Sequence, residues 1–499
     1  MTELTTILQQ AEELESQGKY NDAINLYKQI AAEQPKDTHS RSRLAVIYFT
    51  QGNYEKAERY ARETTKISPK NITEQVIIAD SMWCLGKRDF AIRHLNYILQ
   101  LVPNTPEMHN KIGTRYYSLG DLKNAVKHFD FARQLTPENL KNLKDLAKAL
   151  QFDGRYSESK EIFEEILTLT PDDAEIHFQY GCVLLSEEDS QKAWSHFYWR
   201  HKCVAPHFSK FTANIPQWTG QDLTGKSILV TWEQGIGDTI HFVRYIKDII
   251  KLGARIVLDC RPLMIDLLSH RAPSIQGDIE IHNTEDPQPQ TDYIISMMDI
   301  PLILHSINIS QYGDIDFPYL TAPASLKAQF QTLLSPYKSM KLGLNWQGNP
   351  GFKRDNARSI PLKAFSPLTQ YDNVKLVSLQ AIHGTDQIKD FPGEIIDLEE
   401  HLLSGDEGLS RLAAAIEAVD LVISCDSAVA HLAGALNKKT ILLIPTIPDW
   451  RWGLKGTKSK LYPSIEIFRC PEKTSWLEAL AQTPSIIHNA IDKHNANIT

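Results

Sequence analysis

The sequence predicts an α-helical repeat array followed by an α/β region that contains two parallel β-sheets. Three observations support this fold class. Prolines recur at a spacing of 34 residues through the first 171 positions of the chain. After residue 226, short apolar runs alternate with glycine-containing loops and amphipathic segments, which is typical of βαβ units. Within that region, the apolar run at 421–425 passes directly into small residues at helical spacing.

The composition of the 499-residue chain argues against several classes of protein. A formal net charge of −8 disfavours a nucleic-acid or membrane-surface partner. The six cysteines are scattered and form no CxxC pair, which favours a reducing compartment and disfavours a zinc site. No apolar run reaches the ~20 residues that span a bilayer, and the first residues lack the features of a signal peptide. We therefore expect a cytoplasmic protein without a transmembrane segment.

The first 205 residues repeat with a period of 34. In a helical hairpin, a small residue allows close packing, a glycine ends the first helix and a proline stops the second. Each hairpin exposes an apolar face that its neighbour buries. The pattern resembles a tetratricopeptide-repeat array, whose concave face usually binds a peptide or protein; a spacer or a dimerisation surface is the alternative. The residues in register are Pro35, Pro69, Pro103, Pro137 and Pro171; Gly18, Gly52, Gly86, Gly120 and Gly154; and Ala11, Ala45, Ala79, Gly113, Ala147 and Gly181.

The sixth unit of the array, which ends near residue 205, departs from this pattern. Glu188 replaces the glycine and Ala205 replaces the proline. We interpret the unit as a cap that docks the array 1–205 onto the next domain through a linker at 206–226 that contains prolines and glycines. Its aromatic residues are Trp194, Phe197, Tyr198 and Trp199.

Two α/β halves follow the linker, at 227–335 and 336–499. In the first half we expect a helix at 239–252 and strands at 228–231, 255–259, 279–282 and 293–296. In the second half we expect a helix at 409–418 and strands at 342–346, 374–379, 395–397, 421–425 and 440–444. Two such halves enclose a cleft that is lined by the loops at the carboxyl ends of the strands.

The stretch from Asp420 to Leu436 joins a buried strand to the start of a helix. Asp426 and Ser427 carry side chains that cap helices, and His431 lies one turn further on the same helix face. Free N–H groups and the dipole at a helix start favour an anion. The stretch therefore predicts a diphosphate site; a capped helix with a packed histidine is the alternative.

Motifs in the last ~270 residues resemble the GT-B sugar transferases of the bacterial heptosyltransferase-like group, glycosyltransferase family 9. More specifically, the chain resembles bacterial proteins that fuse tetratricopeptide repeats to such a domain. The resemblance implies two Rossmann-like halves, of which 227–335 binds the acceptor and 336–499 binds a nucleotide-sugar donor. The motifs are Glu233–Ile240 (EQGIGDTI), Asn345–Asn349 (NWQGN), Arg358–Pro361 (RSIP), Val377–Gln380 (VSLQ), Asp426–His431 (DSAVAH) and Pro448–Trp452 (PDWRW).

The resemblance also implies roles for residues of the first half and of the last motif. Asp238 matches the acid proposed as the general base of heptosyltransferases, while its position at a helix start equally fits a helix cap. We expect Gly235 and Gly237 of the same loop to line the donor site. Trp450 or Trp452 would flank the base or sugar of the donor, with core packing as the alternative.

The donor motif of the family reads Asp-Thr-Gly followed by His, and Asp426, Ser427 and His431 match it. Ser427 keeps the hydroxyl group of the family's threonine. Ala428 replaces the glycine and narrows the space through which the backbone approaches the phosphate. We therefore expect these three residues to hold the diphosphate of a donor that differs from that of the family.

Without a metal ion, cationic side chains must stabilise the negative charge of the leaving diphosphate. The loop 347–360 supplies Lys353, Arg354 and Arg358, of which Arg358 lies beside a family motif, while solvated surface charge is the alternative for each. The D-x-D pattern of Asp314 and Asp316 occurs in some metal-dependent transferases, but two neighbouring acids are usually only solvated. We expect no metal site and no cofactor other than the nucleotide-sugar, which is a substrate.

These observations lead to one principal function and two alternatives. The principal hypothesis is a metal-independent, inverting glycosyltransferase that modifies a hydroxyl of a protein recruited by the repeats. One alternative is a transferase that acts on a lipid-linked or surface saccharide. The other is a protein without transferase activity, either a repeat scaffold or an epimerase on the same fold.

Overall fold

The computed structural model describes residues 3–187, 190–203, 215–309, 315–352, 355–405, 407–471 and 474–496. The chain separates into two compact units, Met1–Pro171 and Asp172–Thr499. Five residues that carry sequence-based predictions lie outside the described residues: Glu188, Ala205, Asp314, Lys353 and Arg354.

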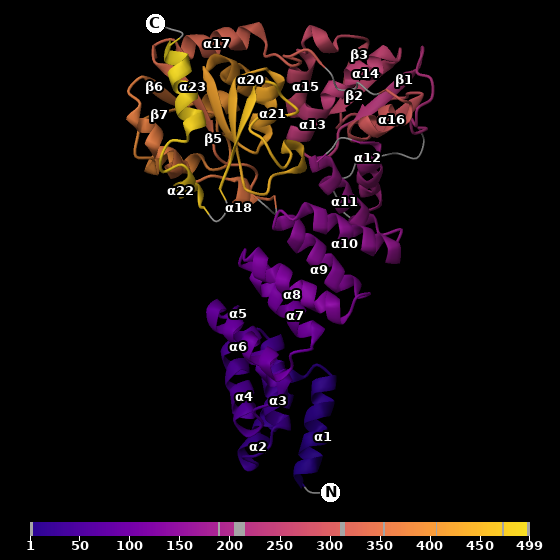
Figure 1. The fold of residues 1–499 in the computed structure, drawn as a ribbon, viewed down its shortest axis with the longest axis vertical. Coiled ribbons are helices and arrows are strands. Elements are labelled where there is room, and N and C mark those ends of the chain that lie inside the picture. The colour runs from indigo at the N-terminus through magenta and orange to yellow at the C-terminus, as the bar shows by residue number, and fades with distance from the viewer. Residues whose placement is uncertain are drawn as a thin grey trace. The chain divides into compact units, whose positions relative to one another are not determined.

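The first unit is a series of antiparallel helix pairs (Figure 1). Each pair covers one 34-residue period, as the sequence predicts. In the described part of the unit, the helices are α1 (Glu3–Ser16), α2 (Tyr20–Glu33), α3 (His39–Thr50), α4 (Tyr54–Ile67), α5 (Ile72–Cys84), α6 (Arg88–Leu101), α7 (Pro106–Ser118), α8 (Leu122–Leu135), α9 (Leu140–Phe152) and α10 (Tyr156–Leu169).

The residues of the three registers act as predicted. The periodic glycines follow the first helix of each pair with φ between +74° and +77°, a left-handed conformation that favours glycine. The small residues lie where two helices meet, and Ala45 and Ala147 are fully buried. At Gly113 an added Cβ would lie 2.7 Å from the ring of Phe129, so only glycine allows α7 and α8 to approach this closely.

The second unit begins with α11 (Ala174–Glu187), α12 (Gln191–Tyr198) and the 3-10 turn η1 (Trp199–Lys202). These elements pack on the α/β region, as the cap hypothesis predicts: the rings of Trp194 and Phe242 lie 6.1 Å apart. The described part of the predicted linker is also packed. Trp218 is fully buried, and its N–H donates a hydrogen bond to the carbonyl of Ile294 (2.9 Å).

The first sheet of this unit has four parallel strands in the order β3-β2-β1-β4. The strands are β1 (Ser227–Thr231), β2 (Arg255–Cys260), β3 (Ile279–Asn283) and β4 (Tyr293–Ser296). The predicted single helix after β1 is instead three segments, α13 (Ile236–Phe242), η2 (Val243–Tyr245) and α14 (Ile246–Lys251). The three segments follow one another without a gap and their junctions keep a helical backbone. The Nε of buried Arg244, in η2, donates to the carbonyl of His241 (3.0 Å). The first half also contains α15 (Pro262–Ser269) and α16 (Ile300–Ser306).

The second sheet has six parallel strands in the order β10-β9-β8-β5-β6-β7. They are β5 (Met340–Asn345), β6 (Val374–Ser378), β7 (Ile395–Asp397), β8 (Leu421–Cys425), β9 (Thr440–Ile444) and β10 (Ile465–Arg469). The edge strand β10 is absent from the sequence prediction. The helices are α17 (Ala324–Leu334), α18 (Asp355–Arg358), α19 (Glu399–Leu403), α20 (Leu409–Ala418), α21 (Ala428–Ala435), α22 (Trp476–Ala479) and α23 (Ser485–Ala496).

Strand β8 is buried on both faces of this sheet. Val422 packs in the cluster that contains residues of α20 and α21, whereas Leu421 and Ile423 pack in the cluster that contains residues of α23 (Figure 1). Because helices cover both faces, all five residues of β8 are shielded from water, and the turn that follows the strand has a rigid base.

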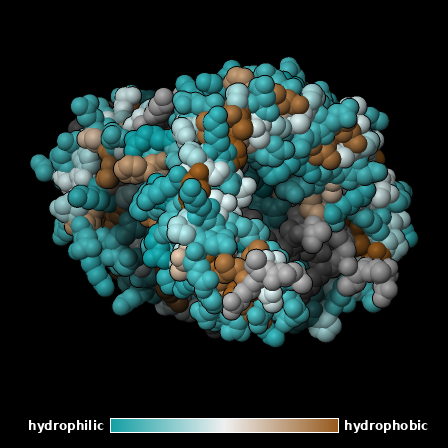
Figure 2. Space-filling view, turned by 90° about the horizontal axis from the view of Figure 1, so that it is seen from below, coloured by the Kyte–Doolittle hydropathy of each residue, from teal (hydrophilic) through white to brown (hydrophobic). Residues whose placement is uncertain are grey.

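The surface shown in Figure 2 carries mostly hydrophilic residues, with apolar residues in small groups. Among the helices in the described ranges, none is both long and apolar enough to span a membrane.

Candidate functional site

Ser427 caps the N-terminus of α21 directly after β8. Its Oγ accepts a hydrogen bond from the N–H of Val429 (3.2 Å). The same hydroxyl donates to Oδ1 of Asn345 (2.7 Å), at the carboxyl end of β5. Parallel pairing of β5 with β8 places the two side chains at one edge of the sheet. The turn therefore has the helix start and hydroxyl that the sequence predicts, and a second strand fixes the hydroxyl.

A buried amide network extends from Asn345 across the ends of three strands. Asn345 Nδ2 donates to Oε1 of Gln380 (2.8 Å), and the hydroxyl of Ser424 donates to Oδ1 of Asn345 (3.1 Å). Gln380 Oε1 also accepts the backbone N–H groups of Trp346 and Gln347 (3.0 Å each). Asn345 and Gln380 belong to motifs found in the sequence, but no role was predicted for either residue.

Asp426 and His431 are joined through Trp452. The indole Nε1–H of Trp452 donates to Oδ1 of Asp426 (2.8 Å), and the indole stacks on the ring of His431 with centroids 4.9 Å apart. Burial and the neighbouring Asp449 raise the pKa of Asp426 to about 6. Burial and the charge of Arg451 lower the pKa of His431 to about 3, so this histidine is neutral near pH 7.

The glycine loop after β1 lies against this turn. Asp238, in the first turn of α13, accepts the N–H of Gly235 on Oδ2 (2.8 Å) and thus caps its own helix. An added Cβ at Gly237 would lie 3.0 Å from Cδ2 of His431 and 3.6 Å from Cα of Ala428. The two halves approach closely here, and a side chain at Gly237 would force the ring of His431 to shift.

Arg451 connects the two halves at the same point, although the sequence analysis assigned it no role. Its Nη2 pairs with Oδ1 of Asp238, and its Nη1 donates to Oδ1 of Asp449 (2.8 Å). Burial raises the pKa of Asp238, while the charge of Arg451 and the N–H of Gly235 oppose this rise. Burial alone would likewise raise the pKa of Asp449, but the charge and hydrogen bonds of Arg451 lower it.

A buried ion cluster holds the start of the glycine loop. Arg200 of η1 donates to both carboxylate oxygens of Glu233 (2.7 and 2.8 Å) and to Oδ1 of Asp299 (2.7 Å). His201 contacts the other oxygen of Asp299 (2.7 Å). The side chains of Arg200, Glu233 and Asp299 are at most 1% exposed. The cap unit thereby fixes the position of the loop that carries Asp238, which sequence patterns did not predict.

The remaining predicted residues have defined surroundings where the structure describes them. Arg358 Nε donates to Oδ1 of Asp355 (3.0 Å), and its charge acts on the pKa of both Asp426 and His431. Trp450 packs against the cap, with its ring centroid 5.6 Å from that of Phe197.

No group of three or more His, Cys, Asp or Glu side chains that could hold a metal ion occurs within the described ranges. One aspartate of the predicted D-x-D pattern, Asp314, falls in the gap between residues 309 and 315.

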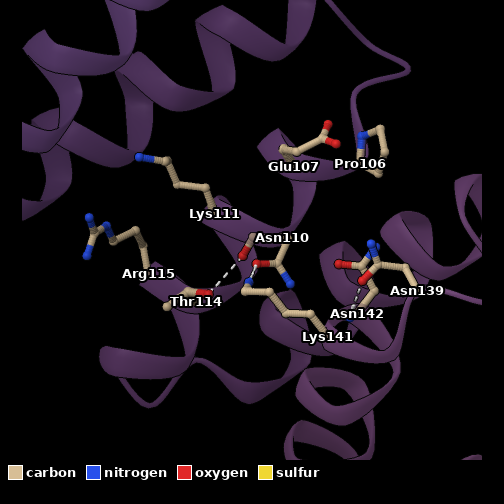
Figure 3. Close-up of a pocket in the computed structure, with 9 residues that line it drawn as sticks. All are labelled: Pro106, Glu107, Asn110, Lys111, Thr114, Arg115, Asn139, Lys141 and Asn142. Atoms are coloured by element: carbon tan, nitrogen blue, oxygen red, sulfur yellow. Dashed lines mark hydrogen bonds between the residues drawn. The ribbon is translucent and has the colours of Figure 1, made fainter. Parts of the chain in front are cut away.

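The first unit contains a separate open pocket of about 430 Å³ between α7 and α9 (Figure 3). Asn110 lies at its centre, where its Nδ2 donates to Asp145 (2.8 Å) and its Oδ1 accepts from Lys141. Arg115 pairs with Asp80 at 3.0 Å. The wall therefore offers amides and paired charges to a ligand. Its lining residues are Pro106, Glu107, Asn110, Lys111, Thr114, Arg115, Asn139, Lys141 and Asn142.

Two family models match the chain. The tetratricopeptide repeat model matches residues 14–75 and 116–177. The model of glycosyltransferase family 9 (heptosyltransferase) matches residues 379–460, a range that contains Asp426, Ser427, His431 and Arg451. These matches confirm the predicted resemblance. Together with the helix pairs and the two parallel sheets, they confirm a repeat array followed by an α/β region consistent with the GT-B fold.

One curated relative shares a quarter of its aligned residues with this chain. Protein FlbA of Caulobacter vibrioides is 25% identical over 352 residues, which are 64% of this chain and 56% of FlbA. This chain therefore spans about half the length of that curated relative.

Helical repeat proteins are among the solved structures that resemble this chain. MamA is 17% identical and covers 34% of this chain and 94% of its own, with a TM-score of 0.32. The C-terminal part of a tetratricopeptide-repeat protein from Cytophaga hutchinsonii is 16% identical over 39% of this chain and 78% of its own, with a TM-score of 0.36. A tetratricopeptide repeat protein from Parabacteroides merdae is 18% identical over 41% of this chain and 81% of its own, with a TM-score of 0.35.

Proposed function

We propose that this chain is a glycosyltransferase that moves a sugar from a nucleotide-sugar to a hydroxyl group of a protein. One observation carries the proposal: the carboxylate of Asp238 and the Ser427-capped start of α21 come from different sheets and meet at one site. Arg451 pairs with Asp238, and Gly237 faces His431 and Ala428. A site with an acidic group on one side and an anion-binding helix start on the other supports both parts of a sugar transfer.

The donor diphosphate binds at the start of α21 in this proposal. The positive end of the helix dipole and the first-turn N–H of Ala428 stabilise the phosphate charge. In the tautomer whose Nδ1 accepts from the hydroxyl of Tyr462 (2.9 Å), Nε2–H of His431 is available as a donor to a phosphate oxygen. Arg358 adds a positive charge. These groups stabilise the leaving diphosphate without a metal ion.

Asp238 is the general base for the acceptor hydroxyl in this proposal. The hydroxyl oxygen attacks the anomeric carbon of the sugar while the bond from that carbon to the diphosphate oxygen breaks. The hydroxyl proton passes to Asp238, and the nucleoside diphosphate leaves with the electron pair. Direct displacement by the acceptor inverts the configuration at the anomeric carbon.

The repeats supply the protein acceptor. The tetratricopeptide match and the open pocket between α7 and α9 support a polypeptide ligand. The exposed wall of this pocket is mostly apolar and carries amides and paired charges, and protein interfaces combine apolar area with hydrogen-bonding groups in this way. A tethered acceptor reaches a higher effective concentration than a free one.

Binding of ADP, CDP, GDP and UDP in EDTA, measured by calorimetry, tests the donor site. We expect at least one to bind, and we expect Ser427→Ala or His431→Ala to weaken it by about 1–3 kcal/mol, the contribution of a charge-assisted hydrogen bond. Ser475→Ala is the control, because the Ser475 side chain also caps a helix, α22, by accepting a backbone N–H. Equal affinity in wild type and in both site variants would refute the proposed donor site.

Transfer is tested by the intact mass of a co-expressed candidate acceptor. Asp238→Asn should abolish the mass increase and preserve the fold, since the asparagine oxygen still accepts the N–H of Gly235. A variant that modifies the acceptor at the wild-type rate would exclude Asp238 as the base.

A further inference from the structure

Arg451 is the cation held most closely against Asp238. Its guanidinium uses Nη2 for Asp238 and Nη1 for Asp449. Its flat face lies over the ring of Trp450, with Cζ 4.3 Å from the centroid. The side chain is 9% exposed, yet its Nε–H has no partner among the described residues. A buried guanidinium with a free N–H is able to accept a further anionic ligand.

The same guanidinium lies next to the proposed diphosphate site. Its neighbour Trp452 donates to Asp426 and stacks on His431. The charge of Arg451 acts on the pKa of both Asp426 and His431. An anion bound at the start of α21 would therefore lie within the electrostatic reach of Arg451.

The present pairing occupies both carboxylate oxygens of Asp238, Oδ1 with Arg451 and Oδ2 with the N–H of Gly235. A carboxylate bound to an arginine and to a backbone N–H holds its negative charge in two interactions that protonation would weaken. Other charged groups around Asp238 are Asp449, Glu233 and Arg261. Of the two cations, Arg451 is the one in direct contact, and its removal would leave the effect of burial, which favours proton uptake.

We propose that Arg451 is a positioning residue that couples donor binding to activation of the acceptor, by changing its partner from Asp238 to the donor diphosphate. This inference rests on the proposed function. Before donor binding, Arg451 holds Asp238 and keeps it from acting as a base. The diphosphate then competes for the guanidinium, and the released carboxylate accepts the proton of the acceptor hydroxyl. Donor binding thus precedes acceptor activation.

A double-mutant cycle on nucleoside-diphosphate affinity tests this competition. The probe is the tightest-binding of ADP, CDP, GDP and UDP, and calorimetry gives the dissociation constant for wild type, Asp238→Asn, Arg451→Gln and the double variant. Asp238→Asn should bind about tenfold tighter than wild type, because the diphosphate no longer competes with a carboxylate. Arg451→Gln should bind about tenfold weaker, and adding Asp238→Asn to it should produce no gain.

The cycle distinguishes competition between Asp238 and the diphosphate for Arg451 from simple charge repulsion between Asp238 and the diphosphate, and from loss of the fold. If Asp238→Asn binds no tighter than wild type, or if it gains equally with and without Arg451, the inference is overturned. Arg451→Lys, which keeps the charge, serves as the second variant if Arg451→Gln fails to fold. Adding Asp238→Asn to Arg451→Lys should retain part of the gain in nucleotide affinity. A wild-type chain that binds none of the four nucleotides would refute the proposed function itself, which is a different outcome from binding without coupling.

Discussion

Replacing Arg200 with methionine should destabilise the second unit severely. Arg200 is fully buried and is the arginine that balances the carboxylates of Glu233 and Asp299. Methionine fills a similar volume without donating a hydrogen bond, so both carboxylates lose their arginine. Asp299 keeps His201, while Glu233 keeps a hydrogen bond from the hydroxyl of Ser296.

The expected loss is about 3–5 kcal/mol. Three hydrogen bonds of 2.7–2.8 Å join the guanidinium to the two acids. Breaking a buried ion pair by removing one partner typically costs about 3–5 kcal/mol, because the remaining charge stays buried. The free energy of unfolding of a domain is about 5–15 kcal/mol, so the variant loses a large part of it.

Urea unfolding followed by tryptophan fluorescence measures this loss. Of the nine tryptophans, only Trp83 precedes residue 172, so the signal reports mainly the second unit. The matched control is Arg255→Met. Arg255 pairs with Glu280 at 2.6 Å, but both side chains are at least 50% exposed, and such surface pairs contribute about 0–1 kcal/mol.

A loss below about 1 kcal/mol for Arg200→Met, equal to that of the control, would refute this reasoning. Adding Glu233→Gln and Asp299→Asn to Arg200→Met should recover part of the stability, because neutral amides carry no uncompensated charge. Failure of this rescue would mean that packing rather than charge makes Arg200 important.

Two further predictions concern the site and the repeats. Because Asp426 has a pKa raised to about 6, its ionisation costs folding free energy that is absent below about pH 4 and complete above about pH 6. Asp426→Asn should therefore be about 1–3 kcal/mol more stable than wild type at about pH 8 and equally stable at about pH 4, as measured by urea unfolding; a constant difference at both pH values would contradict this. Deletion of residues 1–103 should leave nucleotide affinity unchanged and remove modification of the natural acceptor, as judged by intact mass, whereas full-rate modification by the truncated chain would favour the lipid-linked or surface saccharide.

Local sequence patterns were sufficient to predict most elements of this fold. The 34-residue period predicts the helix pairs because burial, close packing and chain reversal each select a residue type at a fixed position. The run Leu421–Cys425 predicts a buried strand, and Ser427 predicts the helix cap, because these properties depend on neighbours within a few residues. Asp238 likewise caps its own helix through Gly235, three residues away.

The partners of the site residues depend on contacts between distant segments. Arg451 is 213 residues from Asp238, and Arg200 is 99 residues from Asp299. Asn345 lies 82 residues from Ser427, whose hydroxyl it binds. A charged or amide residue has the same local pattern whether it faces water or a buried partner, so its partner is set only when the strands and helices pack.

The helical segment around Arg244 is a further feature that local sequence patterns did not predict in full. Its sequence fits one amphipathic helix over 239–252, and the structure contains the 3-10 segment η2 within that range. The guanidinium of Arg244 in this segment binds the carbonyl of His241 and, 217 residues away, the carbonyl of Leu461. The sequence by itself determined the repeats, most strands and the two helix starts, since these follow from local periodicity and capping. Only the tertiary structure decided that Arg451 holds Asp238 and that Arg200 holds the glycine loop, because long-range ion pairs form where packing removes water from both partners.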